Sequence, residues 1–402
     1  MNAFSTSPVK PLANVTVIEL ARVLACPFAD MILAELGANV IKIEQPGTGD
    51  ETRSFEPPVG DESAYFFACN RGKQSVTANL KTDAGRRIVR ELAAGADIVI
   101  ENFPVGTLKR YGLDHEVLRT ENERLIYVSC TGFGQTGPYA KRKGYDTVFQ
   151  AMGGLMSLTG ERGGGPVKPG LPIADLTSGM WIAIGLLSAL NGRSLTGKGC
   201  HIDFSMLDGQ VSLLTLAAGR YFALNEVPPR LGTEHPGRVP SATFACSDGA
   251  FVHITCSDQH WLPLCELLKL DVLAADLDLM TNAGRVARRE RVMSALSKAI
   301  SGWTRTALCE ACDAVGVPAG PINDIAEVLA DPHVRVRGMV GSFEHPTVGI
   351  FGALPLPFKF DGFADPEVVR PPLLGEHTEK VLSERLGYDA QHIAALRRDG
   401  AI

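Results

Sequence analysis

The sequence lacks an excess of basic residues and a long apolar run. Its 402 residues carry 39 Lys and Arg against 45 Asp and Glu, a formal net charge of -6. This balance argues against general binding to nucleic acid or to an anionic membrane, both of which need a basic surface. The longest apolar candidate, residues 180–190, is shorter than the roughly 20 residues of a membrane helix. The first 15 residues contain no apolar stretch, so no secretory signal is visible.

Disulfide and metal patterns are also missing. Nine cysteines are an odd number, scattered through apolar segments. Reduced thiols in a cytoplasmic protein fit this pattern better than a disulfide framework. Cys309 and Cys312 match C-x-x-C, but their apolar helical context favours buried thiols over redox chemistry. The nine histidines show no metal-ligand spacing, so we expect no metal site.

Two common catalytic signatures are absent as well. The turn after the first predicted strand, residues 19–27, holds no G-x-G-x-x-G cluster, which a dinucleotide pyrophosphate would require. Glu44 is therefore interpreted as a strand-end residue and not as a ribose ligand. No G-x-S-x-G motif of a serine hydrolase is present.

The first 130 residues instead alternate strand and helix signals. Short β-branched runs predict strands at residues 15–19, 39–44, 97–101 and 125–129, and apolar spacing predicts helices at 27–36 and 82–94. Such β-α-β units form parallel sheets with right-handed crossovers, so we predict a doubly wound, Rossmann-like α/β domain. Ligands of such sheets bind beyond the carboxyl ends of the strands.

The rest of the chain predicts a second, smaller domain. A helix from Asp175 to about residue 190 is followed by a strand at 200–205 and a helix at 210–224. Residues 227–240 and 316–321 have linker composition, and residues 241–256 predict a β-hairpin around an Asp-Gly turn. We therefore predict a large domain over 1–225 and a small α+β domain over 226–318. The remaining 319–402 contain Pro-rich loops and a helix at 378–386.

Asp175 is the side chain that stands out chemically. It precedes an apolar helix and follows a Gly-rich stretch at residues 153–170. One interpretation is that it only caps that helix. The other is that small residues admit a ligand, the helix N-terminus favours the carboxylate, and the carboxylate acts as a nucleophile.

Basic and aromatic residues also gather where the predicted strands end. The basic positions are Lys42, Arg53, Arg71, Lys73, Arg110 and residues 141–143. Asn102 and Phe103 directly follow a strand and offer an amide and an aromatic face. A solvated charged face is the ordinary interpretation, but this combination also suits a nucleotide that carries phosphates.

Motifs along almost the whole chain resemble the class III CoA-transferases, the formyl-CoA:oxalate and carnitine CoA-transferase family. The matching segments are residues 22–27, 36–44, 70–75, 101–103, 131–138, 144–146, the Asp175 motif and 373–377. The resemblance is nearest to the branch that moves CoA between succinate and other dicarboxylates, such as glutarate or hydroxymethylglutarate.

The resemblance assigns roles to individual residues. Asp175 falls on the family's catalytic aspartate. CoA contacts are implied for Ala25, Asn70, Arg71, Lys73, Asn102, Phe103, Arg110, Lys143 and Tyr145. The chain departs from the family at Leu24, where a Gln is usual, and at Gln45, where the formyl-CoA enzyme has an Arg. Residues 232–237 replace that enzyme's tetraglycine loop, so we expect a different lid and acceptor pocket.

The implied reaction transfers CoA from an acyl-CoA, most simply succinyl-CoA, to a free carboxylic acid through aspartyl intermediates. The alternatives are an α-methylacyl-CoA racemase and a non-catalytic CoA-binding protein. Racemases carry His at Tyr145, and Tyr, with a pKa of about 10, is a poor base near neutrality. Arg22, Arg53 and His235 are candidate anchors for a distal carboxylate.

The resemblance also implies how the subunits assemble and whether a cofactor is permanently bound. We expect an interlocked homodimer of ring-like subunits in which both chain ends build the large domain, 319–402 returning to it. CoA or acyl-CoA enters as substrate, with no permanently bound cofactor. We expect no nucleic-acid or membrane partner and a cytoplasmic location.

Overall fold

The computed structural model describes residues 9–402, which divide into two compact units. The first unit comprises the described residues up to 155 together with 168–219 and 333–402, and the second comprises 156–167 and 220–332. The three-segment division drawn from the sequence stays a prediction.

A six-stranded parallel sheet forms the centre of the first unit, with the order β5-β2-β1-β6-β7-β8. Its strands are β1 (Thr16–Glu19), β2 (Asn39–Glu44), β5 (Gln74–Thr77), β6 (Ile98–Glu101), β7 (Ile126–Thr131) and β8 (His201–Ser205). In chain order this is third, second, first, fourth, fifth and sixth, the order of a doubly wound nucleotide-binding sheet. The prediction of a mixed α/β fold with a parallel sheet is confirmed.

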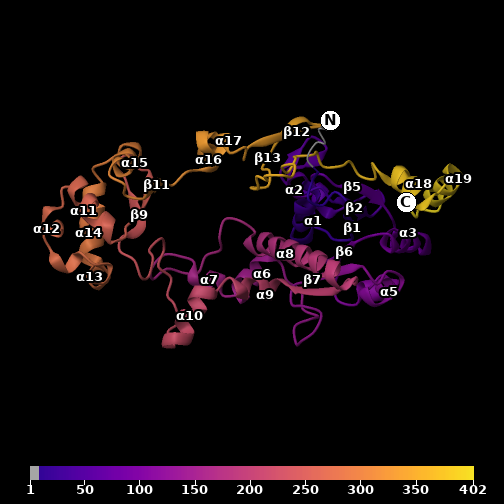
Figure 1. The fold of residues 1–402 in the computed structure, drawn as a ribbon, viewed down its shortest axis with the longest axis horizontal. Helices are drawn as coiled ribbons and strands as arrows, with labels where there is room; N and C mark the ends of the chain where they lie inside the picture. The colour runs from indigo at the N-terminus through magenta and orange to yellow at the C-terminus, as the bar shows by residue number, and fades with distance from the viewer. Residues whose placement is uncertain (1–8) are drawn as a thin grey trace, which may run out of the picture. The chain divides into compact units, whose positions relative to one another are not determined.

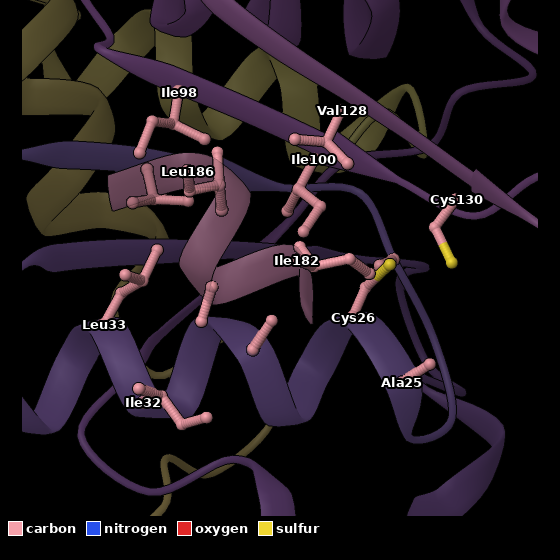
Figure 2. Close-up of a cluster of buried hydrophobic side chains, with 14 of the residues drawn as sticks. Ala25, Cys26, Ile32, Leu33, Ile98, Ile100, Val128, Cys130, Ile182 and Leu186 are labelled. Carbon is pink, nitrogen blue, oxygen red and sulfur yellow. The ribbon is translucent and has the colours of Figure 1, made fainter. Parts of the chain in front are cut away.

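Apolar clusters cover both faces of this sheet, because neighbouring strand residues point to opposite sides. Val17 and Ile100 pack with α1 (Ala25–Glu35) and α8 (Ile173–Thr196) on one face. Figure 2 shows Cys26 and Leu33 of α1 with Ile182 and Leu186 of α8 against Ile98, Ile100 and Val128 of the sheet. Ile18 and Val99 pack on the other face with α3 (Asp83–Ala94) and α5 (His115–Glu121).

The C-terminal segment completes the uncovered edge of the sheet at β5. Gly375 donates its backbone N–H to Ser75 Oγ at 2.8 Å, and His377 N donates to the Ser75 carbonyl at 2.9 Å. Helix α18 (Thr378–Leu386) then lies beside α3, as does the yellow C-terminal end of the chain in Figure 1. The motif at residues 373–377 therefore has a structural role in this unit.

Several elements escaped the sequence prediction. Strand β5 was missed because it has four residues, three of them polar. The tail, predicted as loops and one helix, also contains β12 (Gly341–His345), β13 (Gly349–Ala353) and α19 (Ala390–Arg398). The single helix predicted at 210–224 is wrong. Because the Ser205 side chain caps its start, α9 (Met206–Ser212) begins earlier, and α10 (Thr215–Leu224) is separate.

Shorter elements complete this part of the chain. They are η1 (Glu51–Ser54), β3 (Pro58–Val59), β4 (Glu62–Ser63), α2 (Ala64–Cys69), α4 (Thr107–Tyr111) and α6 (Asp146–Met152), while α7 (Leu155–Leu158) and α17 (Pro332–Val336) each cross a boundary between the two units along the chain. Two of them, α2 and α6, carry residues of the candidate site.

The second unit is a small antiparallel sheet packed on helices. The predicted hairpin is confirmed as β9 (Ser241–Ala245) and β10 (Phe251–Thr255). The predicted linker at 316–321 is wrong in part, since β11 (Ala319–Pro321) pairs with β10 as a third strand. The helices are α11 (Asp258–Leu267), α12 (Asp271–Ala274), η2 (Leu277–Leu279), α13 (Asn282–Ala287), α14 (Arg289–Ile300), α15 (Arg305–Ala314) and α16 (Ile325–Ala330).

Helix α8 is longer than the sequence suggested. It spans 24 residues, and an 18-residue window has a mean hydropathy of 1.6, so by length and composition it could cross a membrane. The expectation that no such segment exists is therefore wrong, because Gly185 and Ser188 continue the helix. Core helices of globular proteins pass the same test, and 33% of the window is buried against the rest of the chain. The cytoplasmic location stays a prediction.

Candidate active site

The N-terminal ends of α1 and α8 lie together at the carboxyl edge of the sheet. A Cβ atom on Gly179 would lie 2.7 Å from the carbonyl oxygen of Ala25 and 2.9 Å from the Phe28 ring. No side chain fits that gap, so glycine permits the two helices to touch there. Asp175 lies one turn before Gly179, at the end of α8 that packs against the start of α1. The structure thus brings Asp175 and Ala25, two of the predicted site residues, into one neighbourhood.

Asp175 does not cap its helix. The N-cap position belongs to Pro172, and Asp175 is the third helical residue, in the first turn. The capping interpretation is therefore wrong. The first turn is instead satisfied from another element, because Asp146 Oδ1 accepts the backbone N–H groups of Ala174 at 2.8 Å and Asp175 at 3.1 Å.

The Asp175 carboxyl has an unusual electrostatic setting. Burial, and then the negative charge of Asp146, raise its pKa from 3.8 to about 7. The helix N-terminus favours the ionised form, whereas burial and the charge of Asp146 disfavour it and raise the pKa. At neutral pH the group is divided between a carboxylic acid and a carboxylate that is more basic than an ordinary aspartate.

A tyrosine hydroxyl shares this setting. Tyr65 of α2 is half-buried, with its ring edge-on to Phe55 at 5.3 Å between centroids. Burial raises the pKa of Tyr65, and the charges of Asp175 and Asp146 raise it further. A neutral phenol therefore lies within electrostatic range of both carboxyl groups.

A buried network of ion pairs joins the ends of strands β1 and β2 to the loops that follow them. Lys42 Nζ lies 2.8 Å from Glu19 Oε1 and 2.9 Å from Asp50 Oδ2, with all three side chains at most 1% exposed. Lys73 Nζ lies 2.8 Å from the other oxygen of Glu19, Oε2. The network fixes the loops that follow β1 and β2 from inside the fold.

Three predicted CoA-binding side chains belong to the interior. Lys73 also donates to Asn70 Oδ1 at 3.0 Å, and Asn70 is fully buried. Arg71 donates to Glu35 Oε1 through two nitrogens, at 2.9 and 2.7 Å. A CoA phosphate would have to compete with these internal partners. These three side chains therefore fix the shape of their loop and are not free charges for a phosphate.

A pocket opens beyond the carboxyl ends of β1, β2 and β6. Its lining includes Arg22, Gln45, Leu80, Phe103 and Tyr111. The Arg22 guanidinium lies 5.1 Å from the centre of the Phe103 ring. The backbone of Arg22 exchanges two hydrogen bonds with the Asn102 side chain, at 3.0 and 2.7 Å, which locks the β1 and β6 loops together. This is the expected place for a ligand in a doubly wound sheet.

The remaining predicted residues are on the surface. Tyr145 is 82% exposed at the start of α6, and Lys143 is exposed two residues earlier. They precede Asp146 directly and so stand next to the Asp175 neighbourhood. Arg110 is exposed on α4.

The proposed carboxylate anchors differ in availability. Arg53 makes a bidentate pair with Glu44, at 2.8 and 2.7 Å, and stacks 3.7 Å from the Phe66 ring centre. Its donors are already used, which argues against an anchoring role. Arg22 is exposed beside the pocket. His235 lies in the second unit, where its Nδ1 accepts the Gly237 N–H.

Sequence reasoning missed Asp146 and Tyr65 as members of the site. Residues 144–146 were noted only as a family motif, and nothing local connects Asp146 to a helix that starts 27 residues later. The available signal was negative, since the start of α8 has no capping side chain of its own.

Comparison with known proteins gives consistent matches. The profile described as "CoA-transferase family III" matches residues 12–378. The "Succinyl-CoA:glutarate CoA-transferase" of Homo sapiens is 39% identical over 395 residues, covering 98% of this chain and 90% of that protein. The "Succinate--glutarate CoA-transferase" of Agrobacterium fabrum is 41% identical over 382 residues, covering 93% of this chain and 95% of that protein.

A solved structure agrees with the sequence matches. A CAIB/BAIF family protein from Brucella suis has 43% sequence identity and a TM-score of 0.85, covering 94% of this chain and all of that one. The agreement extends over both units of the chain.

Proposed function

Because this chain belongs to CoA-transferase family III and is an enzyme of the CoA-transferase type, we propose that it moves CoA from succinyl-CoA to a free dicarboxylic acid, with Asp175 carrying the acyl group. The observation that carries this is the half-buried Asp175 carboxyl at the meeting point of two helix starts, with a raised pKa. The named substrates of the human and Agrobacterium relatives support the choice of succinate and a dicarboxylate.

The proposed chemistry begins with the Asp175 carboxylate. One carboxylate oxygen attacks the thioester carbonyl, the C–S bond breaks, and CoA leaves as thiolate from a mixed anhydride. The thiolate then attacks the aspartyl carbonyl and releases the donor acid. The acceptor carboxylate attacks the resulting aspartyl thioester, and returning thiolate takes the acceptor's acyl group and frees Asp175.

The protein's part is to position and to shield. Each step exchanges one activated acyl bond for another, so no external energy source is consumed. Half-burial of Asp175 limits water, which would hydrolyse the anhydride. Backbone N–H groups at the start of α1, and the Tyr65 hydroxyl, are the proposed donors for the oxyanion formed at each attack. The glycines near 160–165 remain predicted donors.

The assay for this proposal mixes the protein with succinyl-CoA and a panel of acids that includes glutarate and butyrate. A new glutaryl thioester with matched release of succinate supports transfer. Stereochemical change in a 2-methylacyl-CoA without a new thioester would support the racemase instead. Binding of CoA without any product would leave only a CoA-binding protein.

The pocket between Arg22 and Phe103 is the proposed site for the adenine end of CoA. Phe103→Ala removes the stacking face, and base stacking on an aromatic ring is worth about 1–3 kcal/mol. We expect KM for succinyl-CoA to rise by about tenfold or more, with kcat within about threefold. Steady-state kinetics measure both. Phe251→Ala, at an exposed residue of the second unit, is the control, and an unchanged KM in Phe103→Ala would refute this placement.

A homodimer is the proposed assembly, and the outer face of α8 supports it. Met180, Trp181, Ile184 and Leu187 follow helical spacing and are 38–53% exposed. A contiguous apolar stripe of this kind marks an interaction surface. Light scattering should give twice the 43.0 kDa chain mass for the wild type and a smaller species for Trp181→Glu/Ile184→Glu. Leu277→Glu serves as control, and a wild-type monomer would refute the dimer.

A further inference from the structure

The start of α8 is held by a side chain from outside the helix. The first N–H groups of a helix have no partner within it and need an acceptor from elsewhere. Pro172 at the N-cap offers no side-chain acceptor. Asp146 supplies one, accepting from Ala174 and from Asp175 itself.

Asp146 is itself fixed in place. It lies in the first turn of α6, where a carboxylate interacts favourably with the helix dipole. Its second oxygen, Oδ2, accepts a hydrogen bond from the Gln150 amide, and Gln150 is completely buried. Phe149, the buried residue just before Gln150 in α6, packs tightly against Gly132 and Gly144. The Asp146 carboxylate therefore links α6 to α8 through hydrogen bonds from a fixed position.

We propose that Asp146 is a positioning residue for Asp175, holding the first turn of α8 in place and keeping a fixed negative charge behind the nucleophile. The inference rests on the proposed function, since it concerns the same reaction. The proposed role of Asp146 has two parts, the cap and the charge. A neutral acceptor would cap the helix equally well but would not supply the negative charge.

The charge has a chemical consequence. A nearby like charge disfavours ionisation and makes the remaining carboxylate more basic, and greater basicity favours attack on a thioester. The titratable groups that face Asp175 are Asp146 from α6 and Tyr65 from α2. The α1 residues that pack against Gly179, one turn further along α8, are Ala25, Phe28 and Ala29, and all three are uncharged. Asp146 is therefore the charged group that tunes Asp175.

Asp146→Asn separates the charge from the cap, because the amide oxygen still accepts hydrogen bonds. We expect kcat for succinyl-CoA and glutarate at pH 8 to fall by about tenfold, with KM within about threefold. The acid limb of the kcat profile, expected near pH 7 in the wild type, should move down by about one pH unit. Asp83→Asn, an exposed acid in the first turn of α3, should leave rate and pH profile unchanged.

The outcomes distinguish this inference from the proposed function. Unlabelled Asp175 in wild-type protein treated with succinyl-CoA would refute the proposed function, whatever Asp146→Asn does. Normal labelling together with an unshifted acid limb in Asp146→Asn would overturn the role of Asp146 alone. If Asp146→Asn fails to fold, Asp146→Ser, which also keeps an oxygen acceptor without the charge, decides by the same profile: an acid limb below that of the wild type supports the role, and an unshifted limb overturns it.

Discussion

Replacing Asp175 by asparagine is expected to slow CoA transfer by at least about 10³-fold. The amide has the shape of the carboxyl group but cannot form the anhydride or the aspartyl thioester. Because the pocket at Arg22 and Phe103 does not involve this side chain, the affinity for CoA should stay within about threefold. Initial rates with succinyl-CoA and glutarate, together with calorimetric titration of CoA, check both parts.

The control for this variant is Asp208→Asn, which neutralises an exposed acid in the first turn of α9. It should keep the wild-type rate. A normal rate in Asp175→Asn would mean that another side chain is the nucleophile, and loss of CoA binding would mean that Asp175 helps to hold CoA.

The same substitution should stabilise the fold at alkaline pH. Folding raises the pKa of Asp175 from 3.8 to about 7, so between these values the folded state keeps a proton that the unfolded chain has released. Wild-type stability therefore falls as pH rises through this range. Asn pays no such penalty, so we expect a gain of roughly 2–4 kcal/mol at pH 8 and little at pH 4. Urea unfolding at both pH values measures it.

Lys42→Met is expected to cost roughly 3–5 kcal/mol of folding stability. The ammonium lies between two buried carboxylates, Glu19 and Asp50, and their charges raise its pKa although burial alone would lower it. Without it, both carboxylates face the interior with one fewer cation. Urea unfolding near neutral pH measures the loss.

Two controls define this prediction. Lys109→Met removes an exposed ion pair with Glu116, and it should have no measurable effect on unfolding. Adding Glu19→Gln to Lys42→Met should recover part of the loss, since it removes one of the stranded charges. A loss below about 1 kcal/mol in Lys42→Met would contradict the view that the network is tightly coupled.

The parallel sheet was predictable because several of its buried strands are short segments rich in β-branched residues. Residues 39–44 and 97–101 show this pattern. The spacing of the apolar residues in α3 likewise predicts the helix face that packs on the core. Strand β5 does not, since Gln74 and Ser75 are polar and the strand is completed by chain that arrives 300 residues later. Long-range pairing of this kind leaves no local signal.

The residues of the candidate site also differ in whether a local sequence pattern reveals them. Asp175 was recognisable from one helix start and from family motifs. Its acid partner Asp146 was not, because a cap supplied from another element shows no sequence spacing. The cationic positions were misjudged in part for a related reason: sequence reports that Lys73 and Arg53 are charged, but not that Glu19 and Glu44 already neutralise them in the interior.

The most direct test of the account is mass spectrometry of the protein quenched during turnover with succinyl-CoA. The account predicts an aspartyl-CoA adduct on the peptide that contains Asp175, which disappears when glutarate is added and is absent in Asp175→Asn. An adduct on a different residue, or turnover with no adduct at Asp175 under conditions that trap thioesters, would contradict it.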